Sequence, residues 1–427
     1  MTRAWRLVAL APALAAAAAA ACTRTTELIP AAGPSACEAP GPAVSFATVG
    51  GGAACAGALA ARAARFALCA CGDLVLTGNF IVNSIGAPVR GPGGAGATPP
   101  PGAGLGQPPA TSGSPWPGGL PVNGLLPRSF FAAVGTDGDL QVSGHGDVPG
   151  TLVIAGGGDV QLGREGHVLG NAHVAGGLRP GIAYWISNDG DVGGDVIGHL
   201  VVGGALHTPV GATLAPEVQA GAIVREAVTV APPCDCAAGP AFDVAATVEA
   251  RRIRNANPSL SFSEDILDDV ESAQTLDWPC GEYYLATLRS GSGGALELRI
   301  HGHVGIFVAG DVRLGDNLTV TLDAGATLDL VVAGSFYTTG RVFGSPDSPA
   351  GTRLWVGSTT VSLPDQVQFG AFVHAPAAVF SAGAGMTFSG SLFVGTLSVA
   401  GDVRLGYDPA LLQEGAACGA AAPAPVE

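Results

Sequence analysis

The chain has 427 residues, of which 48% are hydrophobic and only 12% are charged, and 66 are glycine. Its net charge of −15 disfavours binding to nucleic acid, which requires a basic surface, so we expect no nucleic-acid partner. The apolar content argues against a disordered chain. It favours two or three ordinary domains or one elongated repeat domain.

The first 21 residues predict a signal peptide. Arg3 and Arg6 precede an uncharged apolar stretch, residues 7–21, which is too short to span a membrane comfortably. The sequence A-A-A-C that ends at Cys22 resembles the lipobox of bacterial lipoproteins, so Cys22 is the predicted lipidation site and membrane anchor. The alternative is ordinary signal-peptide cleavage after an A-x-A site. We expect an exported, lipid-anchored protein of the outer membrane, on its periplasmic face or at the cell surface.

The cysteines support an oxidising location. The chain has nine cysteines, and eight remain once Cys22 is assigned to the lipid, so disulfides are expected. The pairs Cys69/Cys71 and Cys234/Cys236 are too closely spaced to bond comfortably within a pair, so each cysteine is expected to bond elsewhere. The alternative is a four-thiolate zinc site. The disulfide candidates are Cys37, Cys55, Cys69, Cys71, Cys234, Cys236, Cys280 and Cys418.

Ordered structure is expected to begin after a tether, residues 22–55. The Ala-rich stretch 56–68 predicts a helix within an N-terminal capping region, residues 56–72, which could cover one end of a repeat domain. Residues 73–82 then switch to β-forming side chains. Residues 87–127 are rich in Gly and Pro and predict a flexible exposed loop.

Short β-type segments recur in both halves of the chain. LVIAG at 152–156 and LVVGG at 200–204 resemble IFVAG at 306–310, LVVAG at 330–334 and LFVGT at 392–396. An interval of about 20 residues predicts a mainly β fold of the parallel β-helix type, a β-solenoid, in which each coil buries its apolar side on the next. Gly, Asn and Asp at the corners would supply the positive φ angles of tight turns. The alternative is an antiparallel β-sandwich with Gly-rich turns.

The repeats fall into two solenoid parts, residues 73–230 and 291–408. Between them, residues 231–290 predict a small disulfide-stapled helical insertion that packs against the flank or seam of the solenoid. A C-terminal tail, residues 409–427, could cover the second end of the stack.

Two helices are expected within the insertion. Residues 243–257 have a helical pattern that stops before Pro258. Ser261 and Glu264 form a capping box that predicts a second helix over residues 264–273.

Residues 293–411 resemble a β-helical domain of unknown function found in some bacterial type IV pilus assembly proteins. The resemblance rests on the rungs of SGSLFVGTLSVAGDVRL and on the sequence YDPAL that begins at Tyr407. The order CACGDL, rungs, CDC and DWPCGEYYL is similar to that of uncharacterised Gly-rich bacterial surface lipoproteins. This resemblance implies the β-helical architecture and no established activity.

No motif predicts an active site, so we expect a protein without catalytic activity, cofactor or metal. The alternative is a carbohydrate-active β-helix enzyme, a hydrolase or lyase, which would need carboxylates clustered on one face. GHGD at residues 144–147, with His145, resembles an element of polygalacturonase-like enzymes, but the partner motifs are missing. Asp268 and Asp269 lie in the second predicted helix.

Three other groups of residues could carry chemistry. The sequence SNDGDVGGD could bind calcium weakly or place its polar residues at solenoid corners. His301 and His303 could present two imidazoles on one strand face, without an identifiable third ligand. Arg299 and Arg313 lie in strand-like segments away from any acidic cluster. The residues of the first group are Asn188, Asp189, Asp191 and Asp195, and the scattered histidines are His167, His173, His199, His207 and His374.

The sequence therefore favours a structural, adhesive or interaction role at the bacterial cell envelope. The expected partners are the membrane, through the lipid anchor, and a glycan or an envelope protein. An accessory role in pilus or secretion machinery remains an alternative.

Overall fold

The computed structural model describes residues 43–48, 52–85, 132–236 and 242–418. The predicted signal peptide, Cys22, Cys37 and the loop 87–127 lie outside these residues. Part of the predicted tether is folded, because β1 (Ser45–Ala47) and β2 (Ala53–Cys55) form an antiparallel hairpin. The described structure is mainly β, and a parallel sheet of 30 strands dominates it.

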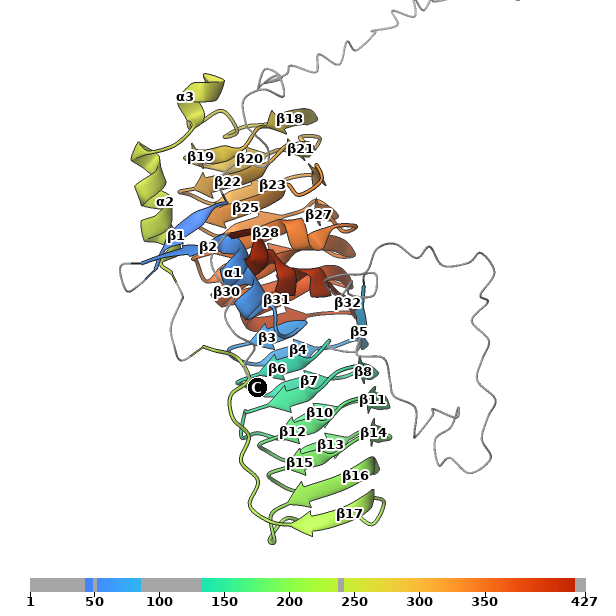
Figure 1. Cartoon of the computed structure of the whole chain (residues 1–427). Helices are drawn as coiled ribbons and strands as arrows, with labels where there is room; N and C mark the ends of the chain where they lie inside the picture. The colour runs from blue at the N-terminus through green and yellow to red at the C-terminus, as the bar shows by residue number, and fades with distance from the viewer. Residues whose placement is uncertain (1–42, 49–51, 86–131, 237–241, 419–427) are drawn as a thin grey trace, which may run out of the picture.

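The strands of this sheet are stacked in three columns, which we call faces 1, 2 and 3 (Figure 1). A typical strand pairs in parallel with the strand three places further along the chain, so three successive strands make one coil with one strand on each face. The parallel pairing within the stack rules out the antiparallel sandwich.

Face 1 consists of thirteen strands or parts of strands. From one end of the stack to the other they are β18 (Gln274–Trp278), β21 (Leu296–Ile300), β24 (Leu318–Leu322), β27 (Val342–Gly344), parts of β30 (Val367–Ala382) and β31 (Met386–Val399), β32 (Val403–Tyr407), β5 (Phe80–Ser84), β8 (Gly146–Val148), β11 (Gly166–Val168), β14 (Tyr184–Ile186), and parts of β16 (Leu200–Thr208) and β17 (Gln219–Arg225).

Face 2 contains β19 (Gly281–Leu285), β22 (His303–Val308), β25 (Thr327–Val332), β28 (Thr352–Val356), further parts of β30 and β31, β3 (Leu68–Ala70), β6 (Val134–Thr136), β9 (Leu152–Ile154), β12 (Ala172–Val174), β15 (Gly190–Val192), and further parts of β16 and β17. Face 3 contains β20 (Leu288–Ser290), β23 (Val312–Leu314), β26 (Phe336–Thr338), β29 (Thr360–Leu363), the last parts of β30 and β31, β4 (Leu74–Leu76), β7 (Leu140–Val142), β10 (Val160–Leu162) and β13 (Leu178–Pro180).

One continuous apolar core fills the space between the three faces. In a three-residue strand such as β7, Leu140 and Val142 are buried in this core while Gln141 between them is exposed. This follows from the two-residue period of a strand. Every coil stacks its apolar residues on those of the next, which is why such short strands are stable only in the stack.

The order of the strands in the stack is not their order in the chain. On face 1, the last strand, β32, pairs with β31 on one side and with β5 on the other. On the other two faces, β3 and β4 continue from β31. The middle coil, which we call the joint coil, thus consists of β32 from the C-terminal end and of β3 and β4 from the N-terminal end. The two predicted solenoid parts form one stack, and the chain enters and leaves it near its middle (Figure 1).

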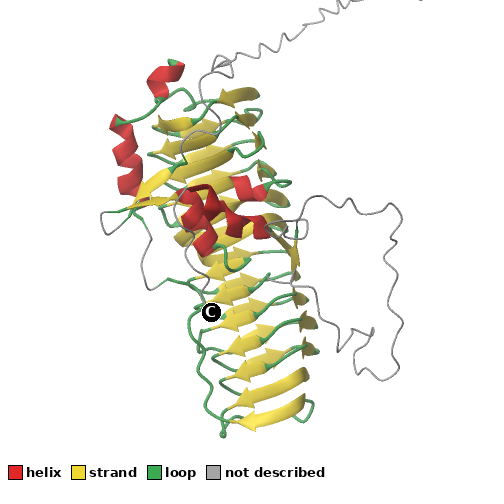
Figure 2. Cartoon of the chain, viewed as in Figure 1, coloured by secondary structure: helices red, strands yellow, loops and turns green. Residues whose placement is uncertain are grey.

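The helices cover the outside of face 2 (Figure 2). A second core joins α1 (Ala56–Ala63), α2 (Val244–Ile253) and the β1–β2 hairpin to outward side chains such as Phe307 and Trp355. The 3₁₀ helix η2 (Pro409–Cys418) packs against α1, and η1 (Pro349–Gly351) lies beside it. We expected α1 and the C-terminal tail to cover opposite ends of the stack. Instead, both lie on its flank, near the joint coil. Among the described helices, none has the length and apolarity needed to cross a membrane.

The end of the stack above β18 is covered by the segment that follows α2. The first predicted helix is present as α2, but the second is absent: after α3 (Asn257–Leu260), residues 261–273 form turns and one bridge, in which Val270 pairs with Ser290. The apolar residues of this segment cover the end of the core: Phe262 packs on Trp278, and Leu267 is buried. The helical insertion ends before residue 274, since β18, β19 and β20 already form the first coil.

Two disulfides fasten the returning chain to the joint coil. Cys69 bonds to Cys234, and Cys71 bonds to Cys236, so neither C-x-C pair is closed on itself. The sulfurs are oxidised, which excludes the four-thiolate zinc site. Cys55 and Cys280 are also disulfide-bonded. Cys234, Cys236 and Cys280, the cysteines of the predicted insertion, are therefore all disulfide-bonded.

Glycines allow the coils to approach at their corners. A Cβ atom on Gly78 would lie 2.3 Å from the backbone of Gly401, and one on Gly144 would lie 2.4 Å from the backbone of Gly78. Neither Gly78 nor Gly144 has a positive φ. At these two corners only glycine fits, because the backbones of successive coils lie too close together for a Cβ atom. The expectation that glycine would be needed there for a positive φ angle is therefore wrong for these two positions.

Candidate functional site

A ladder of histidine, aspartate and tryptophan lies on the outside of face 1. In β8, β11 and β14 the central residue points outward, because its two neighbours are buried in the core. These central residues are Asp147, His167 and Trp185, and parallel pairing places them in register on successive coils. Residues that lie about 20 positions apart in the chain are therefore neighbours in the ladder.

Within this ladder, His145, Asp147 and His167 contact one another. Nε2 of His145 lies 2.7 Å from Oδ2 of Asp147, and Nδ1 of His167 lies 3.0 Å from Oδ1 of the same carboxylate. The three side chains are 26%, 37% and 33% exposed, respectively, so solvent reaches the cluster. The backbone N–H of His145 donates to Oδ1 of Asn79 at 2.9 Å, which ties this corner to the neighbouring coil.

The indole of Trp185 continues the ladder beyond His167. The two rings are stacked, with centroids 4.8 Å apart and an interplanar angle of 16°. The indole also lies 6.4 Å, centroid to centroid, from the ring of His199. The stack orients the imidazole of His167 and gives face 1 a flat, half-exposed aromatic surface.

A second ladder lies on face 2. Nδ1 of His173 lies 2.6 Å from Oδ2 of Asp191, and Asp191 is in register with His207 on the next coil. Nδ1 of His207 lies 2.5 Å from Oε1 of Glu226. This hydrogen bond, supported by the negative charge of Asp191, raises the pKa of His207 above its usual value. The second ladder thus consists of separate imidazole–carboxylate pairs.

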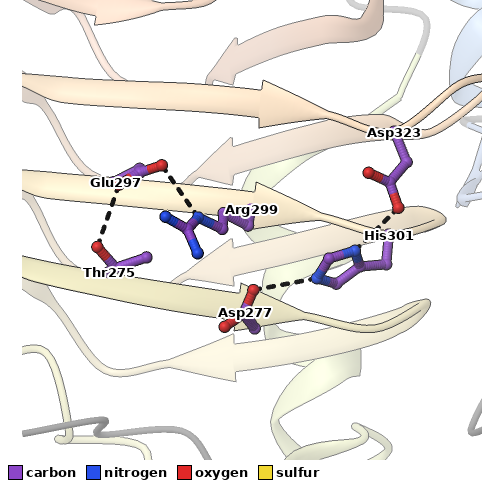
Figure 3. A network of polar contacts seen from close by, with 6 residues as sticks. All are labelled: Thr275, Asp277, Glu297, Arg299, His301 and Asp323. Carbon is purple, nitrogen blue, oxygen red and sulfur yellow. Dashed lines mark hydrogen bonds and ion pairs between the residues drawn. The ribbon is translucent and has the colours of Figure 1, made fainter. Parts of the chain in front are cut away.

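Figure 3 shows a third polar group, near the other end of face 1. The imidazole of His301 lies between two carboxylates, with Nε2 at 3.1 Å from Asp277 and Nδ1 at 2.9 Å from Asp323. The hydrogen bond to Asp323 is the main cause that raises the pKa of His301. Beside it, Arg299 donates to Glu297 at 3.0 Å, and Thr275 donates to the same carboxylate at 3.1 Å.

His303 does not join His301. Its side chain is buried, and Nδ1 lies 2.9 Å from Oγ1 of Thr327. Burial lowers the pKa of His303, so its neutral form is favoured. The interpretation that His301 and His303 present two imidazoles on one strand face is therefore wrong, because the chain turns between them onto face 2.

A buried ion-pair cluster lies beneath the helices on face 2. The guanidinium of Arg353 donates two hydrogen bonds to Asp329, at 2.8 and 2.7 Å, and one to Glu414, at 3.0 Å. The indole N–H of Trp355 donates to Asp329 at 2.9 Å. Arg353 and Asp329 are 3% and 0% exposed, so this cluster joins η2 to the stack and is closed to a ligand.

The acidic sequence SNDGDVGGD contains strand β15 and the corners of the stack on either side of it. Oδ1 of Asp189 accepts from the backbone N–H of Ala205 at 2.8 Å, and Oδ1 of Asp195 accepts from that of Thr213 at 2.7 Å. These carboxylates cap backbone groups of the following coil. Among the described residues, no cluster of three close ligand atoms includes this sequence.

The remaining predicted candidates are engaged with partners near them. Arg313 pairs with Asp311 at 2.8 Å, as Arg299 does with Glu297. Asp268 accepts a hydrogen bond from Thr287 and lies in a turn. His374 is buried among aromatic rings, with its ring centroid 5.1 Å from that of Phe393.

Two groups of described residues bring three possible metal-ligand atoms within 4.8 Å of one another. One consists of Asp137, Cys234 and Cys236, whose cysteines are already in disulfides. The other is the cluster of His145, Asp147 and His167 on face 1. This cluster is the candidate site of the chain.

Of the histidines in the two ladders, sequence reasoning singled out His145 alone; it treated His167, His173, His199 and His207 as scattered. A usable signal was present in the triplets GDV at 146–148, GHV at 166–168, AHV at 172–174 and GDV at 190–192. The same outward position of a repeated unit holds Asp or His each time. Which triplets share a face depends on the exact number of residues in each coil, and this number varies.

Comparison with known proteins adds one finding. Residues 237–414 match a domain of unknown function (DUF7305). The match spans the part of the stack from α2 to η2, and the candidate site lies outside it. No match was found among curated proteins, and none among solved structures.

Proposed function

We propose that this protein is an exported bacterial lipoprotein with a structural, adhesive or interaction role at the cell envelope, and that its body is a parallel β-helix. The observation that carries the proposal is the single unbroken stack of parallel coils. Such a stack forms one core along its whole length and is a suitable rigid spacer.

The joint coil supports this role. The chain enters and leaves the stack near the middle, on the flank beneath α1 and η2, and the two described disulfides secure the returning segment there. Ala43, the first described residue, lines a cavity with Gly281 and Glu282 of β19, so an anchor attached through Cys22 would meet the molecule on the flank near its β18 end. The opposite end of the stack and face 1 around Trp185 would then be available to partners.

A glycan or another envelope protein is the proposed partner. The half-exposed indole of Trp185, stacked on His167, offers the aromatic surface that sugar rings and protein side chains pack on. Binding to envelope glycans is expected to fall in Trp185→Ala. Tyr337→Ala, a partly exposed aromatic on face 3, is the matched control.

The anchoring is tested in intact cells with wild type, Cys22→Ala and Thr23→Ala, the last of which keeps the lipidated cysteine. We expect wild type and Thr23→Ala to remain in the membrane fraction and Cys22→Ala to be released. External protease then decides between the cell surface and the periplasmic face. Equal release, or equal retention, of all three forms would disprove the lipid anchor.

A carbohydrate-active β-helix enzyme is the second candidate. It is favoured by the carboxylates of Asp277, Glu297 and Asp323, which share face 1 (Figure 3). It ranks second because His301 and Arg299 already pair with these groups. Release of reducing ends or unsaturated products from envelope polysaccharides, lost in Asp277→Asn but kept in Asp347→Asn, would establish it.

An accessory role in pilus or secretion machinery is the third candidate, and it rests on resemblance alone. Co-purification of the native protein with pilus components from membrane extracts would separate it from the spacer role.

A further inference from the structure

We propose that His145, Asp147 and His167 form a binding site for a divalent transition metal ion of the zinc type. The site would be independent of the envelope role proposed above, because it needs neither the anchor nor a macromolecular partner. Its donor set is two imidazole nitrogens and one carboxylate oxygen.

The donor chemistry suits this class of ion. Zinc is commonly bound by histidine nitrogen and by carboxylate oxygen at about 2.0–2.2 Å, and three protein ligands leave a fourth position open for water or a ligand. The three ligand atoms already lie within 4.8 Å of one another. Nε2 of His145 and Nδ1 of His167 both face the carboxylate of Asp147, so an ion would replace the protons that these contacts now share.

The backbone arrangement prepares the site. Asp147 and His167 are central residues of β8 and β11, two paired strands in register, so their Cα atoms are fixed by the ladder. His145 is held at the corner by the hydrogen bond from its backbone N–H to Asn79. The stacked indole of Trp185 restricts rotation of the His167 ring. A preorganised set of ligands binds more tightly because less side-chain freedom is lost.

In the rest of the described chain, no other group that contains histidine brings three ligand atoms this close together; His173, Asp191 and His207 are in register but do not do so. His173 contacts one carboxylate, that of Asp191, and His301 contacts two carboxylates without a second imidazole. His173 therefore provides a matched control. It has the same 33% exposed side chain as His167 and a similar contact to aspartate, on the same stack.

The test uses the mature protein purified without a histidine tag. Zn²⁺ affinity is measured by competition with a chromogenic chelator for wild type, His145→Ala, His167→Ala and His173→Ala. We expect one tight site in the wild type. We expect affinity to fall at least about 100-fold in His145→Ala and His167→Ala and to stay unchanged in His173→Ala. The proposal is overturned if wild type binds no stoichiometric zinc, or if all three variants behave alike.

A spectroscopic measurement on the wild type makes the test independent of variant folding. X-ray absorption of the zinc-loaded protein should show a first shell of nitrogen and oxygen with the outer-shell scattering of two imidazoles. A shell that contains sulfur, or that lacks imidazole scattering, would place the ion elsewhere and refute the assignment.

Discussion

The hydroxyl of Tyr407, in the last strand of the chain, donates a hydrogen bond of 2.8 Å to the backbone carbonyl of Ala64, at the end of the first helix. Both residues are buried. This contact joins segments from opposite ends of the chain and links α1 to the joint coil. It gives a specific role to the tyrosine of the YDPAL sequence.

Tyr407→Phe removes this hydrogen bond without changing the packing of the ring. Because the carbonyl of Ala64 would be left buried and unsatisfied, we expect the free energy of unfolding to fall by about 1–3 kcal/mol. Denaturant unfolding, monitored by circular dichroism, measures the change. Tyr337→Phe, on the surface beneath Arg313, should leave stability nearly unchanged. Equal effects of the two substitutions would mean that the Tyr407 contact adds nothing specific.

Arg353→Met should destabilise the protein by about 3–5 kcal/mol, because it leaves the carboxylate of Asp329 buried without its partner. The double variant Arg353→Met/Asp329→Leu should recover part of that loss, since both fully buried charges are removed and only Glu414, whose side chain is 22% exposed, loses its partner. Thermal unfolding of both variants and of the wild type provides the comparison. Arg313→Met, which breaks an exposed pair with Asp311, is the control and should show little effect. No recovery in the double variant would show that the salt bridge acts through more than charge compensation.

The two described disulfides should differ in their resistance to reduction. Cys69 and Cys234 are 1% and 4% exposed, whereas Cys71 and Cys236 are partly exposed. We expect a mild reductant to open Cys71–Cys236 first, because thiolate attack requires access to a sulfur atom. Timed alkylation followed by peptide mass spectrometry reports which cysteines become labelled. Simultaneous labelling of all four cysteines would indicate that the returning segment opens as one unit.

Loss of both described disulfides should lower stability. Replacing Cys69, Cys71, Cys234 and Cys236 together by alanine should lower the free energy of unfolding by about 2–4 kcal/mol, since the two bonds close the same long loop, each with a sequence separation of 165 residues. Either bond alone still closes this loop, so the double variants Cys69→Ala/Cys234→Ala and Cys71→Ala/Cys236→Ala should each lose less and serve as the comparison. If the fourfold variant matches the wild type, the disulfides do not stabilise the joint coil.

The pH dependence of stability should include a contribution from His374. Burial lowers the pKa of His374 to about 4, below its ordinary value of 6.5. The unfolded chain therefore binds a proton more readily than the folded chain between pH 6.5 and 4. Stability should fall across this range as pH decreases, by roughly 3 kcal/mol from this group. His374→Phe, which fits the surrounding aromatic rings, should remove this part of the pH dependence. Parallel curves for variant and wild type would exclude the contribution.

Much of the strand content could be predicted from the residues. Segments such as LVVAG at 330–334 are short apolar runs that end in small residues, and they overlap the core strands β25 and β31 and their neighbours. The prediction of a second helix was wrong for a physical reason. Ile266, Leu267 and Val270 have helical spacing, but they pack against the open end of the core without forming a helix. No local sequence pattern reveals that this end is there to be covered.

The candidate site could be predicted only in part. His145 was identifiable as part of GHGD, but its partner His167 lies 22 positions further along the chain. Neighbours in a stack are set by coil length, and β8 to β11 spans 20 residues while β11 to β14 spans 18.

By itself, the sequence determined that this chain forms short parallel-type strands with Gly-rich corners and disulfides, because recurring β-type segments, turn chemistry and cysteine number are local or compositional properties. Only the tertiary structure decided that β32, β3 and β4 share one coil, and that His145, Asp147 and His167 meet. The edge of a strand offers the same backbone donors and acceptors to any strand that reaches it. The order of coils therefore depends on which segments the whole core brings together, and their order in the chain does not determine it.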